Sequence, residues 1–439
     1  MADDADLTLT ERLLSLWNHL GLETAHVASQ MPGDLVDFAR HHGARLAGVV
    51  LCVPVRLDPS GFSAVARRLL LVSGSEGLTE QVTRSAQARL PDAKRMVLRN
   101  YPAPGWADLM ADRTEEITEA IRDFLAQHPA SPARLAPGTG SHAGILYRIE
   151  GSGPPLVLTP FFLAASQWDP AIAVLARDFT VIVLSGRHIG GVAALEDRAR
   201  APTYRTLVRT MMEIIAPESG SRILDVGCGS GALDRMLATS TAAGCHLTAT
   251  DLNPYLLREA AALAREEGLN DAIRFEPANA EALPFPDASF DHAFSVTVLE
   301  ECDADRALRE LHRVVRPGGR VGVIVRAIDL PQWWHLHLPE TLRRKVDVPP
   351  QSVGARGIAD ASLYRRMQGA GFRNLTCFPG LVTFDRPGGP IWRYREDHVM
   401  TQLTREEIAI WQSATAAAAR DGLLFMANPL HAAVGVRLD

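Results

Sequence analysis

Three glycines at alternate positions, with an acid on either side, are the residues best placed to bind a ligand. The apolar run Ile223-Leu-Asp-Val226 carries Asp225 and leads into Gly227-Cys-Gly-Ser-Gly231, which opens an expected helix. A glycine turn between a strand and a helix lets a ligand lie against bare backbone. A second acid, Asp251, ends the next apolar run, 246–250. The spacing therefore predicts a small-molecule site built from two neighbouring strand ends.

Parallel strands are needed to position these residues, and the whole chain has the matching pattern. Apolar runs alternate with helical segments, as in parallel α/β sheets. We expect strands at 24–28, 46–54, 69–73, 95–98, 144–149, 155–159, 180–184 and 222–226. Residues 129–143 form a linker rich in Pro, Gly, Ser and Ala.

Two α/β domains are expected. The first covers 1–200, with halves 1–128 and 144–200 joined by the linker, and the second covers 201–439. The segment 185–202 carries three glycines and is expected to be a loop.

The composition is that of a globular protein. The chain has 439 residues, 47% hydrophobic and 22% charged, with a formal net charge of −6. This acidic balance argues against a protein that coats nucleic acid or an anionic membrane. Five scattered cysteines form no CxxC pair, which disfavours a zinc site or a disulfide framework. The acidic N-terminus and the absence of an apolar run of about 18 residues predict a cytoplasmic protein without a membrane span.

Four ordered motifs resemble class I S-adenosylmethionine-dependent methyltransferases, in particular the small-molecule branch that contains the ubiquinone and menaquinone C-methyltransferases. The motifs are Leu224-Asp-Val-Gly-Cys-Gly-Ser-Gly231, Thr250-Asp-Leu-Asn-Pro254, Ala280-Glu-Ala-Leu-Pro-Phe-Pro-Asp-Ala-Ser-Phe-Asp291 and Leu308-Arg-Glu-Leu-His-Arg-Val-Val-Arg-Pro-Gly-Gly-Arg320. Their order within about 100 residues argues against a chance match. The resemblance implies a Rossmann-like fold for 201–439, S-adenosylmethionine as cofactor, and methyl transfer to the oxygen, nitrogen or carbon of a small molecule.

The resemblance also implies roles for individual residues. The glycine turn would hold the methionine part of the cofactor, Asp225 would accept from its amino group, and Asp251 would bind both ribose hydroxyls. Asn279 stands where the family has Asp; it keeps an acceptor oxygen for adenine but loses the charge. Ser295 would lie beside the sulfonium, and Tyr204 would cover the cofactor. The implied cofactor-binding residues are Asp225, Gly227, Cys228, Gly229, Gly231, Asp251, Leu252, Asn279, Ala280, Ser295 and Tyr204.

A dinucleotide-binding dehydrogenase is the alternative for this motif. Its fingerprint is GxGxxG, whereas Gly227, Gly229 and Gly231 are each two residues apart. The downstream LPFPDASFD and RPGG strings have no role in a dehydrogenase. The methyltransferase interpretation is therefore favoured.

No motif fixes a catalytic base, and the catalytic residues stay unknown at this stage. Related enzymes often carry Glu-His after the fourth strand, where this chain has Glu300-Glu301. Residues 327–439 are expected to form a substrate cap, in which Trp333, Trp334, His335 and His337 either pack the cap or wall an aromatic pocket. Because no carboxylate cluster accompanies the two histidines, no metal is expected.

The first domain resembles an α/β-hydrolase whose two halves stand in reversed order. Residues 16–128 resemble the C-terminal half, with a strand–elbow–helix pattern at 22–34, and residues 144–192 resemble the N-terminal half. Together they would fold as one circularly permuted domain, so a second, mainly parallel sheet is expected.

The hydrolase chemistry of this domain is degenerate. The elbow reads Ala28-Ser-Gln-Met-Pro32, so Gln30 takes the nucleophile position and Ser29 falls one residue early. Glu76 is the one candidate acid, and Trp106 replaces the terminal histidine. Without nucleophile and base, acyl transfer is not expected. The domain would then serve as a scaffold, a lid or a dimerisation surface, which makes a homodimer a reasonable expectation.

Two other functions remain open. One is a bifunctional or hydrolytic enzyme that uses Ser29 with His26, and the other is a non-catalytic regulator that only binds the cofactor. A nucleic-acid methyltransferase is disfavoured by the acidic charge. It is also disfavoured because Ser295-Val-Thr-Val-Leu299 lacks the Pro-Pro motif expected after the fourth strand.

Overall fold

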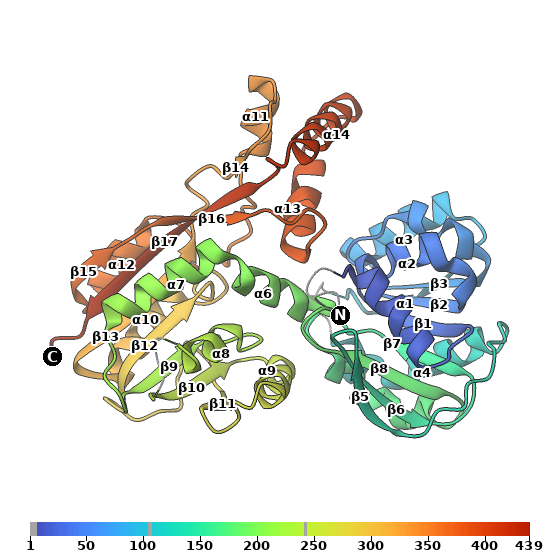
Figure 1. The fold of residues 1–439 in the computed structure, drawn as a ribbon, viewed down its shortest axis with the longest axis horizontal. Coiled ribbons are helices and arrows are strands. Elements are labelled where there is room, and N and C mark those ends of the chain that lie inside the picture. Colours follow the sequence, from blue (N-terminus) through green and yellow to red (C-terminus); the bar gives the residue numbers. More distant parts are fainter. Residues whose placement is uncertain (1–6, 104–107, 241–243) are drawn as a thin grey trace. The chain divides into compact units, whose positions relative to one another are not determined.

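The computed structural model describes residues 7–103, 108–240 and 244–439, and Trp106 lies outside them. The chain divides into two compact units, Met1–Ala193 and Ala194–Asp439 (Figure 1). The division falls within helix α6 (Gly190–Arg200), before the predicted boundary at 200.

The prediction of a loop at 185–202 is wrong, because most of this segment forms helix α6. Gly190 and Gly191 begin the helix instead of interrupting it, and the run Val192–Arg200 after them is rich in strong helix formers. Gly190 has φ +71° and would bring a Cβ within 2.6 Å of Pro160, so the glycine there serves a close approach of backbone.

The sheet of the first unit runs β4-β3-β2-β1-β7-β8-β6-β5 among the described residues. Its strands are β1 (Ala25–Ser29), β2 (Leu46–Cys52), β3 (Leu69–Ser73), β4 (Lys94–Val97), β5 (Gly138–His142), β6 (Ile145–Gly151), β7 (Pro155–Leu158) and β8 (Thr180–Ser185). Strand β1 pairs in parallel with both β2 and β7, so Val27 lies between Val49 and Val157. Strand β6 is antiparallel to β5 and β8. The sequence halves on either side of the linker therefore share one sheet.

Helices cover both faces of this sheet. They are α1 (Leu9–His19), α2 (Val36–His42), α3 (Gly77–Arg89), α4 (Leu109–Leu125) and α5 (Asp169–Leu175). One core includes Phe161 and Trp168, and the other includes Trp17 and Phe38. Alternation along β1 sends Ala28 into the first core and Val27 into the second.

The sheet of the second unit runs β11-β10-β9-β12-β13-β17-β14. Its strands are β9 (Arg222–Val226), β10 (His246–Asp251), β11 (Ile273–Pro277), β12 (Phe290–Val296), β13 (Val315–Arg326), β14 (Trp333–Trp334), β15 (Arg373–Cys377), β16 (Gly380–Phe384) and β17 (Met426–Val436). The first five in the order are parallel, and β17 joins them antiparallel to β13. Strands β15 and β16 also pair with β17.

Helices connect and flank these strands. They are α7 (Pro202–Ile215), α8 (Ala232–Ala238), α9 (Pro254–Glu266), α10 (Ala304–Val314), α11 (Glu340–Val346), α12 (Ser362–Gly369), α13 (Pro390–Met400) and α14 (Arg405–Arg420).

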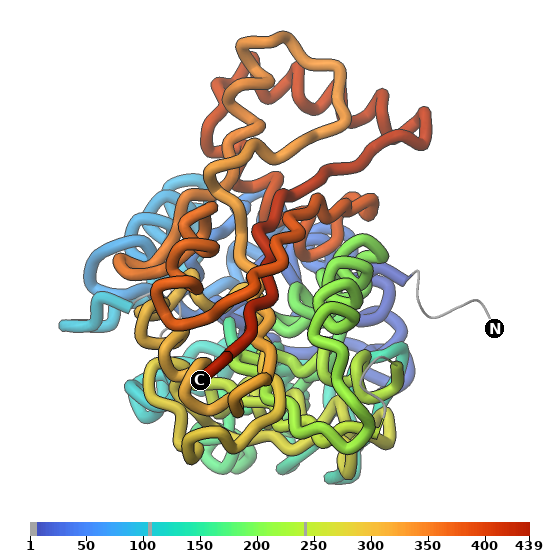
Figure 2. Tube along the Cα trace, turned by 90° about the vertical axis from the view of Figure 1, so that its left-hand side faces the viewer, coloured from blue at the N-terminus to red at the C-terminus, as the bar shows by residue number. Residues whose placement is uncertain are grey.

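The expected cap at 327–439 is only partly a cap, because its last strand belongs to the sheet. Residues of β17 are almost all buried, and the strand lies between β13 and β14 on one side and β15 and β16 on the other. Helices α11, α13 and α14 gather beyond the end of the sheet where β17 begins (Figures 1 and 2). The ring of Trp334 holds α13 and α14 together, with centroids 5.2 Å from Trp392 and 4.8 Å from Trp411.

Of the helices described, none combines the length and the apolar run required to cross a bilayer.

Candidate functional site

A pocket of about 330 Å³ opens at the carboxyl ends of β9, β10 and β12. In an open α/β sheet this edge is the usual place for a ligand. Nine of the residues predicted from the sequence line its wall: Asp225, Gly227, Cys228, Gly229, Asp251, Leu252, Asn279, Ala280 and Tyr204.

The glycine turn is held against β10 by backbone hydrogen bonds. The amides of Gly227 and Cys228 both donate to the carbonyl of Thr250, at 2.7 and 2.8 Å. Gly227 has φ +87°, and a Cβ there would lie 2.1 Å from the Val298 side chain. Only glycine therefore fits at this position, and the wall of the pocket is backbone.

Two predicted residues do not line the pocket. Gly231, with φ +68°, would place a Cβ 3.0 Å from Phe275 and 3.1 Å from Ala260, so its small size serves the packing of α9 on the sheet. The Ser295 side chain is fully buried and donates to the carbonyl of Val226 at 2.8 Å, between the strands. Ser295 therefore does not face the pocket as predicted, whereas Thr297, two residues further on, lines its wall.

Asp251 is oriented by two backbone amides. One carboxylate oxygen accepts from Gly229 at 2.9 Å, and the other accepts from Asn253 at 2.8 Å. Each oxygen keeps a free lone pair, which matches a pair of adjacent hydroxyls. Burial raises the pKa of Asp251 against the effect of these hydrogen bonds.

One end of the pocket suits a flat heterocycle. The Leu252 side chain lines the wall with 71% of its surface exposed, which leaves an apolar face for stacking. Asn279 Oδ1 accepts from the amide of Glu281 at 2.9 Å, so the side chain is fixed by its own turn. Ala280 follows on the wall. The carbonyl oxygen of Asn279 has a second lone pair for a ligand amine.

Two buried carboxyl groups lie together at the start of the turn. Asp225 lines the wall and is 3% exposed, and Asp234 from α8 is fully buried, with neither oxygen hydrogen-bonded to a donor in the described part of the chain. Burial, reinforced by Asp234, raises the pKa of Asp225 well above its usual value. Burial likewise raises the pKa of Asp234 to about 7. A cation bound beside this pair would favour the charged form of both carboxyl groups.

Three further groups of the pocket wall were predicted from the sequence only in part. Tyr204 from α7 is 1% exposed, and its hydroxyl has no hydrogen-bond partner among the described residues. The Arg198 guanidinium from α6 lies 5.3 Å from the Tyr204 ring. Thr297 has φ +57°, which is strained for a β-branched residue, and such strain gathers at functional sites. The sequence gives no signal for that backbone angle.

The two glutamates after β12 differ in environment. Glu300 is 1% exposed and accepts from the Arg326 amide at 2.7 Å, and burial raises its pKa to about 7. Glu301, on the pocket wall, keeps 73% of its side chain exposed and lies 3.6 Å from Arg326 Nη2. These two environments do not identify either Glu300 or Glu301 as a catalytic base.

The aromatic and histidine residues of the cap do not line this pocket. Trp334 is buried in the cluster with Trp392 and Trp411, and Trp333 lies edge-on to Phe425. Trp334 therefore has a packing role, whereas substrate contact by the exposed Trp333 and His337 stays a prediction. Within the described ranges, no group of three or more His, Cys, Asp or Glu side chains is arranged to hold a metal.

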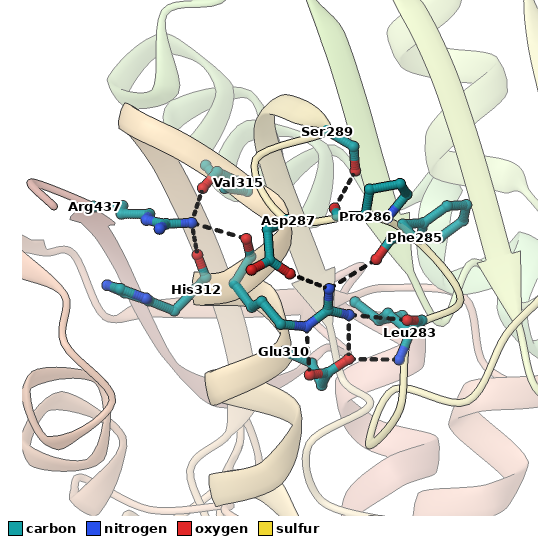
Figure 3. Close-up of polar contacts among 10 residues, drawn as sticks. Leu283, Phe285, Pro286, Asp287, Ser289, Glu310, His312, Val315 and Arg437 are labelled. Carbon is teal, nitrogen blue, oxygen red and sulfur yellow. Dashed lines mark hydrogen bonds and ion pairs between the residues drawn. The ribbon is translucent and has the colours of Figure 1, made fainter.

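The remaining motifs are structural. Arg313, in the string before RPGG, donates to the carbonyls of Phe285 and Leu283 and pairs with Asp287 and Glu310 (Figure 3). These contacts fix the 283–289 loop onto α10. Arg437 binds the carbonyls of residues 312, 313 and 315, which ties the end of β17 to the same place (Figure 3).

The candidate hydrolase residues of the first unit do not form a catalytic pair. Gln30 Oε1 accepts from the Phe162 amide at 2.8 Å, and Ser29 Oγ is held by Thr159 at 2.7 Å and by the Met31 amide. His26 and Ser29 are three residues apart on β1, so their side chains point to opposite faces of the sheet. Burial lowers the pKa of His26 to about 4. Neither group can activate the other.

Comparison with known families identifies the second unit. Residues 224–323 match the family described as "Methyltransferase domain". Over 122 residues the chain is 37% identical to the ubiquinone/menaquinone biosynthesis C-methyltransferase of Hahella chejuensis, covering 28% of this chain and 49% of that protein. Over 160 residues it is 34% identical to the malonyl-[acyl-carrier protein] O-methyltransferase of Erwinia billingiae, covering 35% and 60%.

Two further similarities complete the comparison. An uncharacterized protein of Mycobacterium bovis is 39% identical over 137 residues, covering 31% of this chain and 47% of that protein. The chain thus spans about half the length of the curated relatives it matches first. The YcgJ protein of Bacillus subtilis covers 54% of this chain and 99% of its own, at 19% identity and a TM-score of 0.37.

Residues 224–323 therefore match a methyltransferase domain, and the cofactor that the comparisons support is S-adenosylmethionine. The residues present fit that molecule. Its ammonium group matches the buried carboxyl groups of Asp225 and Asp234, of which both Asp234 oxygens lack a donor among the described residues, and its ribose hydroxyls match Asp251. Its carboxylate matches Arg198, whose buried Nε has no partner among the described residues.

Proposed function

We propose that this chain transfers a methyl group from S-adenosylmethionine to a small-molecule acceptor. The observation that carries the proposal is the pocket in which a glycine backbone turn lies between the carboxylates of Asp225 and Asp251. The relatives with assigned names include a quinone C-methyltransferase and a carrier-protein O-methyltransferase, so the domain type is used on chemically different acceptors. We therefore leave the acceptor atom open.

The bound cofactor supplies an already activated methyl group on a sulfonium. The chain's own contribution is then to hold the donor, to place the acceptor in line with it and to exclude water. Asp225 and Asp251 orient the two ends of the donor, and Tyr204 closes the wall. Thr297, at the end of β12, brings backbone and hydroxyl to the wall next to Val298.

We further propose that the first unit is a circularly permuted, catalytically silent hydrolase-like domain. The strand order supports this, because β5-β6-β8-β7-β1-β2-β3-β4 is the hydrolase order read from the second half of the sequence, with an antiparallel second strand. The side chains of Ser29 and Gln30 are both held in hydrogen bonds, which supports the absence of hydrolase catalysis in this unit. A scaffold, lid or dimerisation role would follow.

A labelled-methyl assay tests the proposed function. The full chain is incubated with methyl-labelled S-adenosylmethionine and a pool of small metabolites, and label is followed into the small-molecule and macromolecular fractions. We expect label in small molecules with the wild type and, at a cofactor concentration below the wild-type dissociation constant, about tenfold less or lower with Asp251→Ala. Label that appears only in protein or nucleic acid, or equally with the variant, would reject the proposal.

A further inference from the structure

The carboxyl groups of Asp225 and Asp234 form a buried acidic pair at the wall of the cofactor pocket. Asp234, in the first turn of α8, is fully buried, and within the described ranges no donor binds either of its oxygens. The Asp225 carboxyl group lines the pocket and lies within hydrogen-bond reach of Asp234. Two ionised carboxylates offer only acceptors, so a hydrogen bond between them requires a proton on one of the two. The contact therefore favours a protonated pair.

The cations on the neighbouring helices do not bind this pair. Arg235 follows Asp234 on α8, but its Nη2 lies 2.8 and 2.7 Å from the two carboxylate oxygens of Glu196. Its Nε binds Glu267 at 3.1 Å, and its Nη1 binds a backbone carbonyl at 2.7 Å. Arg198 on α6 lines the pocket, and its buried Nε has no partner in the described part of the chain. A doubly ionised pair would therefore be buried without a cation bound to it, which is costly.

The surroundings of the pair oppose its ionisation further. Burial raises the pKa of Asp234 to about 7, and burial together with Asp234 raises the pKa of Asp225 well above its usual value. The negative charge of Asp251, across the glycine turn, acts on Asp225 in the same direction. Besides Asp225, the titratable groups on the described pocket wall are Arg198, Tyr204, Cys228, Asp251, Glu301 and Cys302, and no histidine is among them.

The ammonium group of the cofactor would reverse this balance. Asp225 lines the pocket, so a cation bound there lies against one member of the pair. A nearby positive charge favours the ionised form of a carboxyl group, and here it also offers the donors that the pair lacks. The proton that the pair holds then has no role in the complex and passes to solvent.

We propose that Asp234 is a positioning residue that acts through Asp225, and that the cofactor's ammonium group displaces a proton from this pair when it binds. The inference rests on the proposed methyltransferase function and adds a pH dependence to the same site. Above the pKa of the free pair, binding has no proton to displace. Below it the proton must be expelled, so affinity falls as the pH falls, by up to about tenfold per unit for one proton.

Titration calorimetry of the full chain at pH 5, 6 and 7 tests this inference. One ligand is S-adenosylhomocysteine, which carries the ammonium group, and the other is 5′-methylthioadenosine, which keeps the adenosine and thioether but lacks the amino-acid part. An α-amino group titrates near pH 8, so the ammonium stays charged throughout this range. Each titration is run in two buffers that differ in ionisation enthalpy, and the difference in heat gives the number of protons released.

The variant is Asp234→Asn, and its matched control is Asp92→Asn at an exposed surface pair with Arg67. The asparagine amide can donate to Asp225 and keep that carboxylate ionised, so the variant should lose most of the proton release. Circular dichroism shows whether the variant is folded. The comparison of the two ligands on the wild type requires no variant and decides the inference even if Asp234→Asn does not fold.

We expect S-adenosylhomocysteine to release about one proton at pH 6 and to bind about tenfold or more tightly at pH 7 than at pH 5. The methylthioadenosine should release fewer protons and show a flatter dependence, and Asp92→Asn should behave as the wild type. Binding of S-adenosylhomocysteine without proton release, equal release by the two ligands, or an unchanged pH dependence in folded Asp234→Asn would each overturn the inference. A wild type that fails to bind S-adenosylhomocysteine at every pH would instead reject the proposed function, and this inference with it.

Discussion

Glu196 and Arg235 form a buried, two-pronged ion pair that fixes α6 to the helix after the glycine turn. Arg235 Nη2 lies 2.8 and 2.7 Å from the two carboxylate oxygens of Glu196, and the two side chains are 4% and 6% exposed. The same glutamate accepts from Ser230 Oγ at 2.6 Å. Helix α6, which brings Arg198 to the pocket, is thus held by the residues that follow the glycine turn.

Breaking that pair should be costly. Glu196→Ala leaves the Arg235 guanidinium buried without its main partner, and loss of one member of such a pair typically costs about 3–5 kcal/mol. Urea unfolding measures the loss of free energy of unfolding. It is taken from the transition of the second unit, or from the single transition if the whole chain unfolds cooperatively. Glu340→Ala is the control, because Glu340 and Arg344 are 63% and 78% exposed and should contribute less than about 1 kcal/mol. Equal effects of the two variants would contradict the anchoring role.

Removal of the Asp251 carboxylate should weaken cofactor binding without unfolding the chain. Asp251→Ala takes two charge-assisted hydrogen bonds from the ribose, so we expect a loss on the order of 2 kcal/mol or more. Calorimetry with S-adenosylhomocysteine gives the value. Asp92→Ala, at a surface pair with Arg67, is the matched control and should bind normally. An unchanged dissociation constant for Asp251→Ala would show that this carboxylate does not hold the ribose.

A single methyl group at the glycine turn should be enough to block the cofactor. Gly227→Ala forces a Cβ to 2.1 Å from Val298 and places alanine at φ +87°. The turn must shift, and we expect cofactor binding to fall at least tenfold while far-UV circular dichroism stays native. Gly268→Ala is the control, because that glycine has a similar φ of +72° but open space around it. Wild-type affinity in Gly227→Ala would rule out the described turn.

The two buried carboxyl groups should make the cofactor-free protein less stable as the pH rises. Burial raises the pKa of Asp234 to about 7 and raises that of Asp225, whereas both titrate near 3.9 when unfolded. Between about pH 4 and pH 7 the folded state therefore holds more protons, and the free energy of unfolding falls with rising pH by up to about 1.4 kcal/mol per unit for one proton. This destabilisation is complete above the folded pKa.

Asp234→Asn isolates that effect from the other titrating groups. The difference in unfolding free energy between the variant and the wild type should move in favour of the variant from pH 4 to pH 7 and then level off. Urea titrations at unit pH intervals, without cofactor, measure it. A difference that is constant across this range would mean that Asp234 titrates normally in the folded protein.

Gln30 should matter for the stability of the first unit and not for methyl transfer. Gln30→Ala removes the acceptor of the Phe162 amide, which costs about 1–3 kcal/mol if the amide stays buried. The labelled-methyl assay at a temperature where the variant is folded should give wild-type turnover. Large loss of turnover in a folded variant would assign the first unit a direct part in the reaction.

The sequence was sufficient for the cofactor half of the site because that half is made by local rules. The glycine turn, Asp225 and Asp251 all sit at strand ends that hydrophobic patterning locates, and the structure places them on one pocket wall. Seven of the eight strands described in the first unit were located for the same reason, whereas β5 was missed because it lies in the stretch 129–143 that was predicted to be a linker.

What the sequence could not provide depends on contacts distant along the chain. Ser295 and Thr297 are two residues apart, and Thr297 is the one that lines the pocket. Its backbone has a positive φ there, which no sequence pattern predicts. The C-terminal strand was missed because β17 is antiparallel and reads as part of an irregular tail.

The most direct test of the central claim is calorimetric titration of the purified full chain with S-adenosylhomocysteine, alongside Asp251→Ala and Gly227→Ala. The account predicts one saturable site in the wild type and a loss of at least tenfold in each variant. A wild type with no affinity for this molecule, or two variants that bind as the wild type does, would contradict it.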